Sequence, residues 1–532
     1  MNRPVDLRPS LSRYLHQRLT SFEQGFRHNL ALLGPAGSGK SLLLQQVLQS
    51  SPAKVTRIYC ALQRDSVREF LKRFSAALLH AVVEAPFHAP LEDLMRQAKT
   101  VAPKTVSAIE QLERYTGGHL PAEGFVRALD VIPILHEECG RPCILVLDEF
   151  LHLEELGLSH AFHELGKRVM TWPYTLFLVT SSSTCRARQI LRERLQLLFG
   201  QFELLSLGPI ETAAATAWTH EQLPGTKAQP ALVRFLLHWI GTHPWYLNVL
   251  LTRAKERSQL KRERKLTDAT IVQAAWDVLG SPDGVLHQWC AAHVQRIVHQ
   301  RNGPLAREAL VAIAGGARTT QAIAARCGTR RQLSEAVQML VEDDLVHRKG
   351  ACWVIPDQLF ACWLVAVLRP AQARGSLDTA AAFQLFDQAL RTVWGEWQAA
   401  SQQPLVERIG RLLTQFRNET VSLDHKTGRL PTFRTLATQQ PSERPERYLV
   451  ADGEERRWCC MVHDGLLDEA AVTGFEHFCR AQSPRPSRKI VVAKDGLELN
   501  AKLLAKEANM WVWEPEDLNL LFLLYGQPTL NR

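Results

Sequence analysis

A segment early in the chain has the residue types and spacing that bind phosphate groups. It reads Gly34, Pro35, Ala36, Gly37, Ser38, Gly39, Lys40 and Ser41. Glycines let the backbone wrap around an anion, so that amide N–H groups and the start of a following helix point at the negative charge. In the pattern G-x-x-x-x-G-K-[ST], the lysine reaches the β- and γ-phosphate oxygens and the hydroxyl residue ligates Mg²⁺. The segment therefore predicts a site for ATP and Mg²⁺.

Two acidic residues follow a second apolar stretch, CILVLD at residues 143–148. We expect Asp148 to hold Mg²⁺ through water, and Glu149 to polarise the water that attacks the γ-phosphate. A third stretch, residues 175–180, is followed by a run of serines at 181–183. We expect Ser182 to sense the γ-phosphate, with Ser181 and Ser183 as alternatives, although such clusters also form ordinary turns.

These residues lie at the ends of apolar runs that have the character of strands. The runs are residues 29–34, 55–60, 143–148, 175–180 and 202–207. Helix-length segments separate most of them, which predicts an α/β fold with a parallel sheet covered on both faces. We assign residues 1–210 to this P-loop unit. Residues 211–300 lack a strand pattern and predict a helical lid.

The rest of the chain predicts two further units. In residues 301–370, two short helices separated by a Gly-containing turn, a third helix and a strand pair indicate a winged helix-turn-helix. The Pro, Gly and Ser residues of 369–376 indicate a linker. Residues 380–532 predict a separate α/β domain, with strands at 447–452, 456–462 and 489–494.

Composition limits the protein class. A chain of 532 residues with 46% hydrophobic and 22% charged residues is typical of a globular protein with several domains. The formal charge of +9 suits a polyanionic partner. The 11 cysteines include no C-x-x-C pair, and no apolar run approaches the roughly 20 residues that cross a bilayer. We expect a reduced, cytoplasmic protein with no membrane partner.

The phosphate-binding segment and the acidic pair resemble those of the archaeal-type ATPases, a branch of the AAA+/STAND P-loop NTPases. The resemblance covers most of residues 20–370, and it extends to LVTSSS, ELLSLGPIETAAA, GTHPWYL and DQLFACWLVAVLRP. In relatives, a Gly-x-His-Pro segment lies in the lid, with its proline near the nucleotide base. The resemblance therefore implies that His243 and Pro244 sense the nucleotide; the alternative is a helix start without ligand contact.

This chain departs from the family before its fifth strand. Relatives often carry Gly-Arg there, and such an arginine can act on the nucleotide of a neighbouring subunit. This chain has Gly200 and Gln201 instead. The upstream residues that can substitute are Arg186, Arg188, Arg192 and Arg194, although charges on a helix are usually a solvated face. The assembly state stays open, an oligomer included.

The carboxyl-terminal unit resembles the restriction-endonuclease-like fold. Active members hold Mg²⁺ with an acid on one strand and an E-x-K on the next. The matching positions are Tyr448, Met461 and His463, none of which is a carboxylate. We therefore expect an inactive domain without nuclease activity. If the strand register differs, Asp452, Glu454 or Asp464 could restore a metal site.

The predicted winged helix carries polar and basic residues suited to double-stranded DNA. These are Arg330, Arg331 and Gln332 at the start of its third helix, with Arg348 and Lys349 in the wing. The alternative is a protein partner at the winged helix or the carboxyl-terminal domain. Acidic residues on the same unit favour that alternative: Glu335, Glu342, Asp343 and Asp344.

Together these features predict an ATPase that acts as a molecular switch. ATP or ADP binding would order the α/β unit and the lid, and hydrolysis would reset the switch slowly. One alternative is a DNA-remodelling or DNA-loading motor of the AAA+ class. Another is a signalling scaffold that holds nucleotide without turnover.

Overall fold

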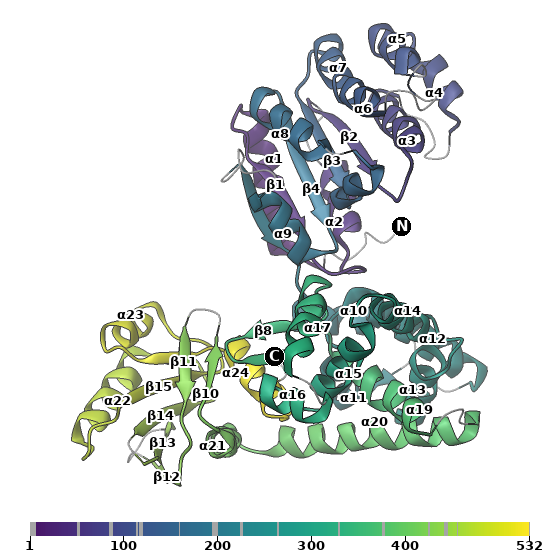
Figure 1. Ribbon diagram of the computed structural model, residues 1–532. Coiled ribbons are helices and arrows are strands. Elements are labelled where there is room, and N and C mark those ends of the chain that lie inside the picture. The colour runs from purple at the N-terminus through teal and green to yellow at the C-terminus, as the bar shows by residue number, and fades with distance from the viewer. Residues whose placement is uncertain are drawn as a thin grey trace. The chain divides into compact units, whose positions relative to one another are not determined.

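The chain divides into two compact units. The structure, a computed structural model, describes residues 7–50, 54–83, 89–112, 115, 121–158, 160–193, 201–223, 227–262, 265–327, 330–374, 378–423, 426–440, 445–454 and 456–530. One unit comprises Met1–Trp218 with His243–Trp245, and the other Thr219–Thr242 with Tyr246–Arg532. Figure 1 shows the elements of both units.

A parallel sheet lies at the centre of the first unit. Its five strands have the order β2-β3-β4-β1-β5. They are β1 (Asn29–Leu33), β2 (Thr56–Ala61), β3 (Cys143–Asp148), β4 (Thr175–Ser181) and β5 (Phe202–Ser206). The five apolar runs predicted as strands are these strands, within one residue at each end. The prediction of an α/β fold with a parallel sheet is therefore confirmed.

Helices cover both faces of this sheet. Because successive side chains of a strand point to opposite faces, Leu30 and Leu32 enter one core and Ala31 and Leu33 the other. The first core contains α1 (Pro9–Glu23) and α2 (Lys40–Gln49). The second contains α3 (Val67–His80), α4 (Leu91–Ala98), α5 (Pro103–Leu112), α6 (Pro121–Leu129), α7 (Val131–Cys139), the 3₁₀ helix η2 (Phe150–Leu156), α8 (Ala161–Thr171) and α9 (Thr184–Glu193).

The segments after β5 are mainly helical. They are α10 (Thr212–Gln222), α11 (Pro230–Ile240), α12 (Pro244–Leu260), α13 (Asp268–Ala275), the π-helical turn η4 (Trp276–Gly280) and α14 (Val285–Val298). Two short parallel strands, β6 (Lys227–Ala228) and β7 (Lys265–Leu266), also pair here, where the sequence predicts no strand. None of the helices that the structure describes is long and apolar enough to cross a membrane.

A group of helices and a hairpin follow in the order expected for a winged helix. They are α15 (Gly303–Ala314), α16 (Thr320–Cys327), α17 (Arg330–Glu342), β8 (His347–Lys349) and β9 (Cys352–Val354). The buried face of α17 has helical spacing, with Leu333, Ala336, Val337 and Leu340 fully or almost fully enclosed. The assignment of a DNA-binding motif to these elements stays a prediction.

Strand β9 of this hairpin belongs to the core of the carboxyl-terminal sheet. Cys352 and Val354 of β9 are buried in the same cluster as Ile409 and Trp458. The amide of Ala351 donates to the carbonyl of Thr420 at 2.7 Å. A side chain at Gly350 would collide with the backbone of residues 420–422. The predicted wing is therefore attached to the following domain through its turn and β9.

The carboxyl-terminal part contains a mixed sheet of five strands, in the order β12-β13-β14-β15-β16. These are β12 (Thr435–Gln439), β13 (Arg447–Asp452), β14 (Arg457–His463), β15 (Arg488–Ala493) and β16 (Trp511–Trp513). A separate hairpin precedes them, β10 (Glu419–Ser422) and β11 (Thr427–Leu430). The helices are α20 (Thr379–Gln402), α21 (Leu405–Gln415), α22 (Glu469–Ala481), α23 (Leu499–Glu507) and α24 (Pro515–Leu524).

The structure corrects the prediction of a linker after residue 368. Residues 369–374, which the sequence assigns to a linker, form helix α19 (Arg369–Arg374) after α18 (Gln358–Trp363) and the π-helical turn η5 (Leu364–Leu368). Pro370 lies inside this continuous helical segment, directly after the π-helical turn, and removes one backbone hydrogen bond from it.

Candidate phosphate-binding site

The glycine-rich loop connects β1 to α2, as the sequence predicts. Gly37 and Gly39 have φ angles of 73° and 91°, which favour glycine. A Cβ at Gly34 would collide with the carbonyl of Leu207, and one at Gly37 would lie 2.9 Å from Cβ of Trp245. The amide of Gly34 donates to the carbonyl of Ser181 at 3.1 Å. The glycines are therefore required both by backbone conformation and by close neighbours.

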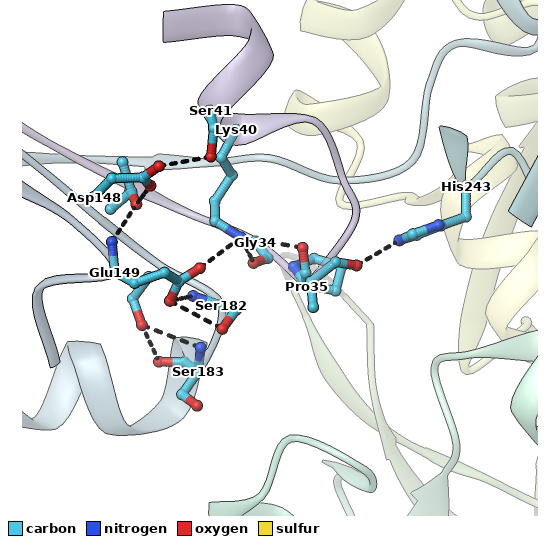
Figure 2. Close-up of polar contacts among 12 residues, drawn as sticks. Gly34, Pro35, Lys40, Ser41, Asp148, Glu149, Ser182, Ser183 and His243 are labelled. Atoms are coloured by element: carbon cyan, nitrogen blue, oxygen red, sulfur yellow. Dashed lines mark hydrogen bonds and ion pairs between the residues drawn. The ribbon is translucent and has the colours of Figure 1, made fainter. Parts of the chain in front are cut away.

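Lys40 is the first residue of α2, and its side chain is only 5% exposed. Its Nζ donates to the carbonyls of Gly34 at 2.9 Å and Pro35 at 3.2 Å, and lies 3.4 Å from Oε1 of Glu149 (Figure 2). Burial lowers the pKa of Lys40, and the charge of Glu149 opposes that effect. The ammonium group therefore lies at the mouth of the loop, beside a helix start that attracts anions.

Ser41 and Asp148 are brought together, as predicted for a metal site. The Ser41 Oγ donates to Oδ2 of Asp148 at 2.7 Å. Asp148 is 5% exposed, and it also accepts hydrogen bonds from the hydroxyls of Tyr59 and Thr180. Burial and the Asp148 carboxylate raise the pKa of Tyr59, which therefore remains a donor. Hydroxyl and carboxylate oxygens are the ligands that Mg²⁺ prefers, so the donor set fits this ion.

Tyr59 and Thr180 are contacts that the sequence reasoning missed. In the parallel register, Ala61 pairs with Asp148, and Leu147 pairs with Val179. The register therefore brings Thr180 beside Asp148, one residue before the predicted serines. Strand order was the missing signal, because only neighbouring strands bring these residues together.

Glu149 lies immediately after β3 in a left-handed conformation, with φ of 56°. Its amide donates to Oγ1 of Thr180 at 3.0 Å. Its Oε2 accepts from the amide of Ser182 at 2.8 Å and from the Ser182 hydroxyl at 3.0 Å (Figure 2). This conformation is uncommon for a residue with a side chain and costs on the order of 1 kcal/mol. Hydrogen bonds at both ends of the residue hold it there.

Of the three serines at the end of β4, Ser182 is the one that contacts Glu149. Ser181 and Ser183 instead bond each other, through the amide of Ser183 and the hydroxyl of Ser181 at 3.1 Å. Ser182 as a sensor of the γ-phosphate remains a prediction. Its contact with Glu149 nevertheless sets it apart from the other two serines.

His243 and Pro244 lie against the loop within the same compact unit. The His243 Nε2 is 3.0 Å from the carbonyl of Ala36, and Pro244 begins α12. Burial lowers the pKa of His243 to about 4, and the charges of Arg8 and Lys40 act in the same direction. The imidazole is therefore neutral near pH 7, and its Nε2–H donates to Ala36. These two residues belong to the loop's surroundings, although their role as sensors remains a prediction.

Arg8 is a further contact that the sequence reasoning missed. Its guanidinium donates to the carbonyls of Ser38 at 3.2 Å, Pro209 at 3.2 Å and Gly208. Burial lowers the pKa of Arg8. Arg8 thus links the loop to the segment after β5. No local pattern marks an arginine that lies far from its partners in the chain.

The arginines considered as substitutes for a family arginine have other partners. Arg186 forms an ion pair with Glu154 at 2.7 Å. Arg192 pairs with the neighbouring Glu193 at 3.3 Å, and Arg188 donates to Ser206 at 3.2 Å. Arg194 and Gly200 lie outside the described residues. The three candidate arginines that the structure describes are therefore each engaged with a residue of their own unit.

The residues predicted to bind DNA are divided between α17 and the wing. Gln332 is exposed, and the side chains of Arg330 and Arg331 lie outside the described residues. Arg348 is exposed, but its guanidinium lies 5.6 Å from the ring of Trp353 and donates to the carbonyl of Gly350 at 2.9 Å. Lys349 is half-buried. The basic residues of the predicted wing are therefore less available to contact DNA than the sequence suggests.

In the carboxyl-terminal sheet, Tyr448 pairs directly with Met461, and both are buried under α22 and α23. Asp452 pairs with Arg457, and Glu454 pairs with Arg434. Within the described parts of the chain, no group of three or more His, Cys, Asp or Glu residues could hold a metal ion. Loss of the nuclease chemistry remains a prediction.

Comparison with known proteins does not assign this chain to a family, so the assignment of the site rests on the geometry described above. No protein-family profile matches the sequence, and no curated protein does. Among solved structures, a Walker-type ATPase of Pyrococcus abyssi is similar, with 16% identity over 68% of this chain and 99% of that chain and a TM-score of 0.44. The ORC2 protein of Aeropyrum pernix in ADPNP–ADP complexes shows 12% identity over 73% of this chain and 95% of that chain, with a TM-score of 0.42. The ORC1 protein of Aeropyrum pernix in complex with DNA shows 17% sequence identity over 69% of this chain and 94% of that chain, with a TM-score of 0.37.

The neutral state of His243 predicts a pH dependence. Because its folded pKa of about 4 lies below the unfolded value of 6.5, the unfolded chain binds more protons between these values. Stability should therefore fall as pH decreases through this range, by at most about 3 kcal/mol. In His243→Asn, whose amide can still donate to Ala36, urea unfolding of the first unit should lose part of this dependence. His163→Asn, at an exposed position of the first unit, is the control, and equal pH profiles for both variants would contradict the assignment.

Proposed function

We propose that this protein binds ATP with Mg²⁺ at the glycine-rich loop and hydrolyses it slowly, as a nucleotide-dependent switch. The observation that carries the proposal is the meeting of Lys40, Ser41, Asp148 and Glu149 at the carboxyl edge of β1 and β3. Open α/β sheets bind ligands at this edge. The loop amides and Lys40 would bind the β- and γ-phosphates.

Ser41 and Asp148 would hold the metal ion. When bound, Mg²⁺ neutralises charge on the phosphate oxygens. Tyr59 and Thr180 orient the Asp148 carboxylate by donating hydrogen bonds to it. Such hydrogen bonds fix the direction in which a carboxylate ligand points.

Glu149 is the residue that we propose to act on the attacking water. Its carboxylate is 30% exposed and is bonded to Lys40 and Ser182. Lys40 competes with any water that approaches Oε1 of Glu149, which supports slow turnover and a switch rather than a fast motor.

Replacing Lys40 by Ala tests the phosphate site. The change removes the cation that faces the phosphates, so ATP affinity should fall by about tenfold or more. Isothermal titration of ATP measures the change, with Lys54→Ala at an exposed position as the control. Equal affinities for the two variants would refute the assignment of the site.

Replacing Glu149 by Gln separates binding from hydrolysis. The amide is nearly isosteric and can still accept from Ser182, but it cannot take a proton from water. We expect ATP affinity within a few-fold of the parent, and a phosphate release rate reduced by roughly 10²-fold or more. Glu69→Gln, at an exposed position of α3, is the control. Hydrolysis that stays at the parent rate would remove Glu149 from its proposed role.

We further propose that the second unit binds double-stranded DNA through α17, with a protein partner as the alternative. The support is the exposed polar face of α17 opposite its buried apolar face. ATPase rates with and without DNA separate the remaining alternatives, because a motor should be strongly stimulated and a scaffold should hardly turn over.

Substitution of Arg330 and Arg331 by Ala tests the DNA proposal. Each lost phosphate contact should reduce the slope of log affinity against log salt by roughly one unit. If the arginines read bases instead, discrimination between sequences should fall more than affinity. Fluorescence anisotropy with a labelled duplex measures both, and Arg485→Ala serves as the exposed control. Binding that is indifferent to the double change would favour a protein partner.

We also propose that the carboxyl-terminal domain does not cleave DNA. Tyr448 and Met461 are buried and offer no carboxylate to a metal ion. Purified protein with Mg²⁺ or Mn²⁺ should leave duplex DNA intact, with or without ATP. Metal-dependent nicking that persists in Lys40→Ala but is lost on changing Asp464 would show an active nuclease.

A further inference from the structure

A cavity of about 680 Å³ lies in the second unit. Its lining residues belong to α11, α20, α21, the loops after β14 and β15, and the segment after α24. The side chains that give it chemical character are Arg234, Arg408, Lys494, Trp394, Trp397 and Gln403. Cavities of this size hold small molecules in many proteins.

The cavity contains more positive than negative charge. Of the described residues that line it, Arg234, Arg408 and Lys494 are cations and Asp464 is the one carboxylate. No ion pair joins any of these three cations to a described carboxylate within 4.0 Å. An anion is therefore the ligand that would balance the site.

Arg408 is the cation whose position needs an explanation. It is 5% exposed, its guanidinium lies 4.3 Å from the ring centroid of Phe522, and it donates to the carbonyl of Pro528. Burial lowers its pKa to about 10, and the nearby charge of Arg411 acts in the same direction. A buried charge without a counter-charge is strongly unfavourable unless another group compensates it.

A second observation concerns Gln403, which begins the turn between α20 and α21. Its Oε1 is buried and has no hydrogen-bond partner among the described residues. Buried polar atoms are normally paired, so each exception requires an explanation. Gln403 lines the cavity, so a ligand with a hydroxyl or amino group would supply the missing donor once the side chain turns its enclosed Oε1 towards the cavity.

Trp394, which lines the cavity, packs against two other aromatic rings. The Trp394 ring lies 4.3 Å from Phe235 and 5.9 Å from Trp397, centroid to centroid. Trp394 is half-buried, whereas Trp397 is buried. Indole rings present a flat apolar surface with a negative face, suited to another planar ring.

We propose that this cavity binds a small phosphorylated molecule with a planar ring, of the nucleoside monophosphate class. Arg234, Arg408 and Lys494 bind the phosphate, Gln403 bonds a polar group of the ligand, and Trp394 contacts the ring. Guanidinium groups match phosphate oxygens because their N–H donors are planar and fixed in direction. The site is independent of the ATP site proposed for the glycine-rich loop.

The test uses the full chain with Lys40→Ala, so that the glycine-rich loop contributes little nucleotide binding. AMP is titrated while tryptophan fluorescence and heat are recorded. We expect saturable binding, which weakens at least about tenfold on adding Arg234→Ala and Lys494→Ala together. Lys502→Ala, whose lysine pairs with Glu514 at 3.0 Å, is the matched control and should leave the affinity unchanged.

Further measurements keep the proposal falsifiable if one variant folds poorly. Far-ultraviolet circular dichroism establishes that the double variant is folded, and Arg408→Lys retains the charge but loses the planar donors. Adenosine, which lacks the phosphate, should bind at least about tenfold more weakly than AMP, and inorganic phosphate should compete with AMP. Equal AMP affinity in the double variant and the Lys502→Ala control would overturn the proposal. So would a lack of saturable AMP binding at about 1 mM.

Discussion

The buried ammonium of Lys40 is the charge around which the glycine-rich loop is arranged. Lysine is almost never enclosed unless partners surround it. Here two loop carbonyls and the Glu149 carboxylate provide them, so the position of the loop and that of the acidic residue depend on the same group. Any anion that draws Lys40 towards itself must also change what Glu149 contacts. The contact between Glu149 and Ser182 extends this dependence to the end of β4.

The parts that could be predicted are those whose physics is local in the sequence. Strands β1, β3 and β4 are buried at every position and read as continuous apolar runs, which is why the sequence predicts their bounds within one residue. The phosphate loop lies within one short segment and its spacing is explicit. Tyr59, Thr180 and Arg8 were not found because their positions depend on strand order and on contacts far apart in the chain. No local pattern distinguishes them from other residues of their type.

The carboxyl-terminal part contains strands that the sequence does not predict. Strand β12 is exposed at nearly every position, and β10 and β11 have four residues each. Such short or polar strands form through pairing with neighbours rather than through their own pattern. The cavity beside α20 and α21 was missed for a related reason, because Arg234, Arg408 and Lys494 come from distant segments. Each of them reads in the sequence as an ordinary charged surface residue.

The attachment of β8 and β9 to the carboxyl-terminal sheet affects how this protein can change during evolution. Cys352 and Val354 share a core with Ile409 and Trp458. Replacing either the hairpin or the carboxyl-terminal domain would therefore alter the surface against which the other packs. Exchange of domains between genes would have to carry the two together, as one inherited module. Substitutions at these core positions should then accumulate in correlated pairs, whereas the exposed face of α17 can diversify alone.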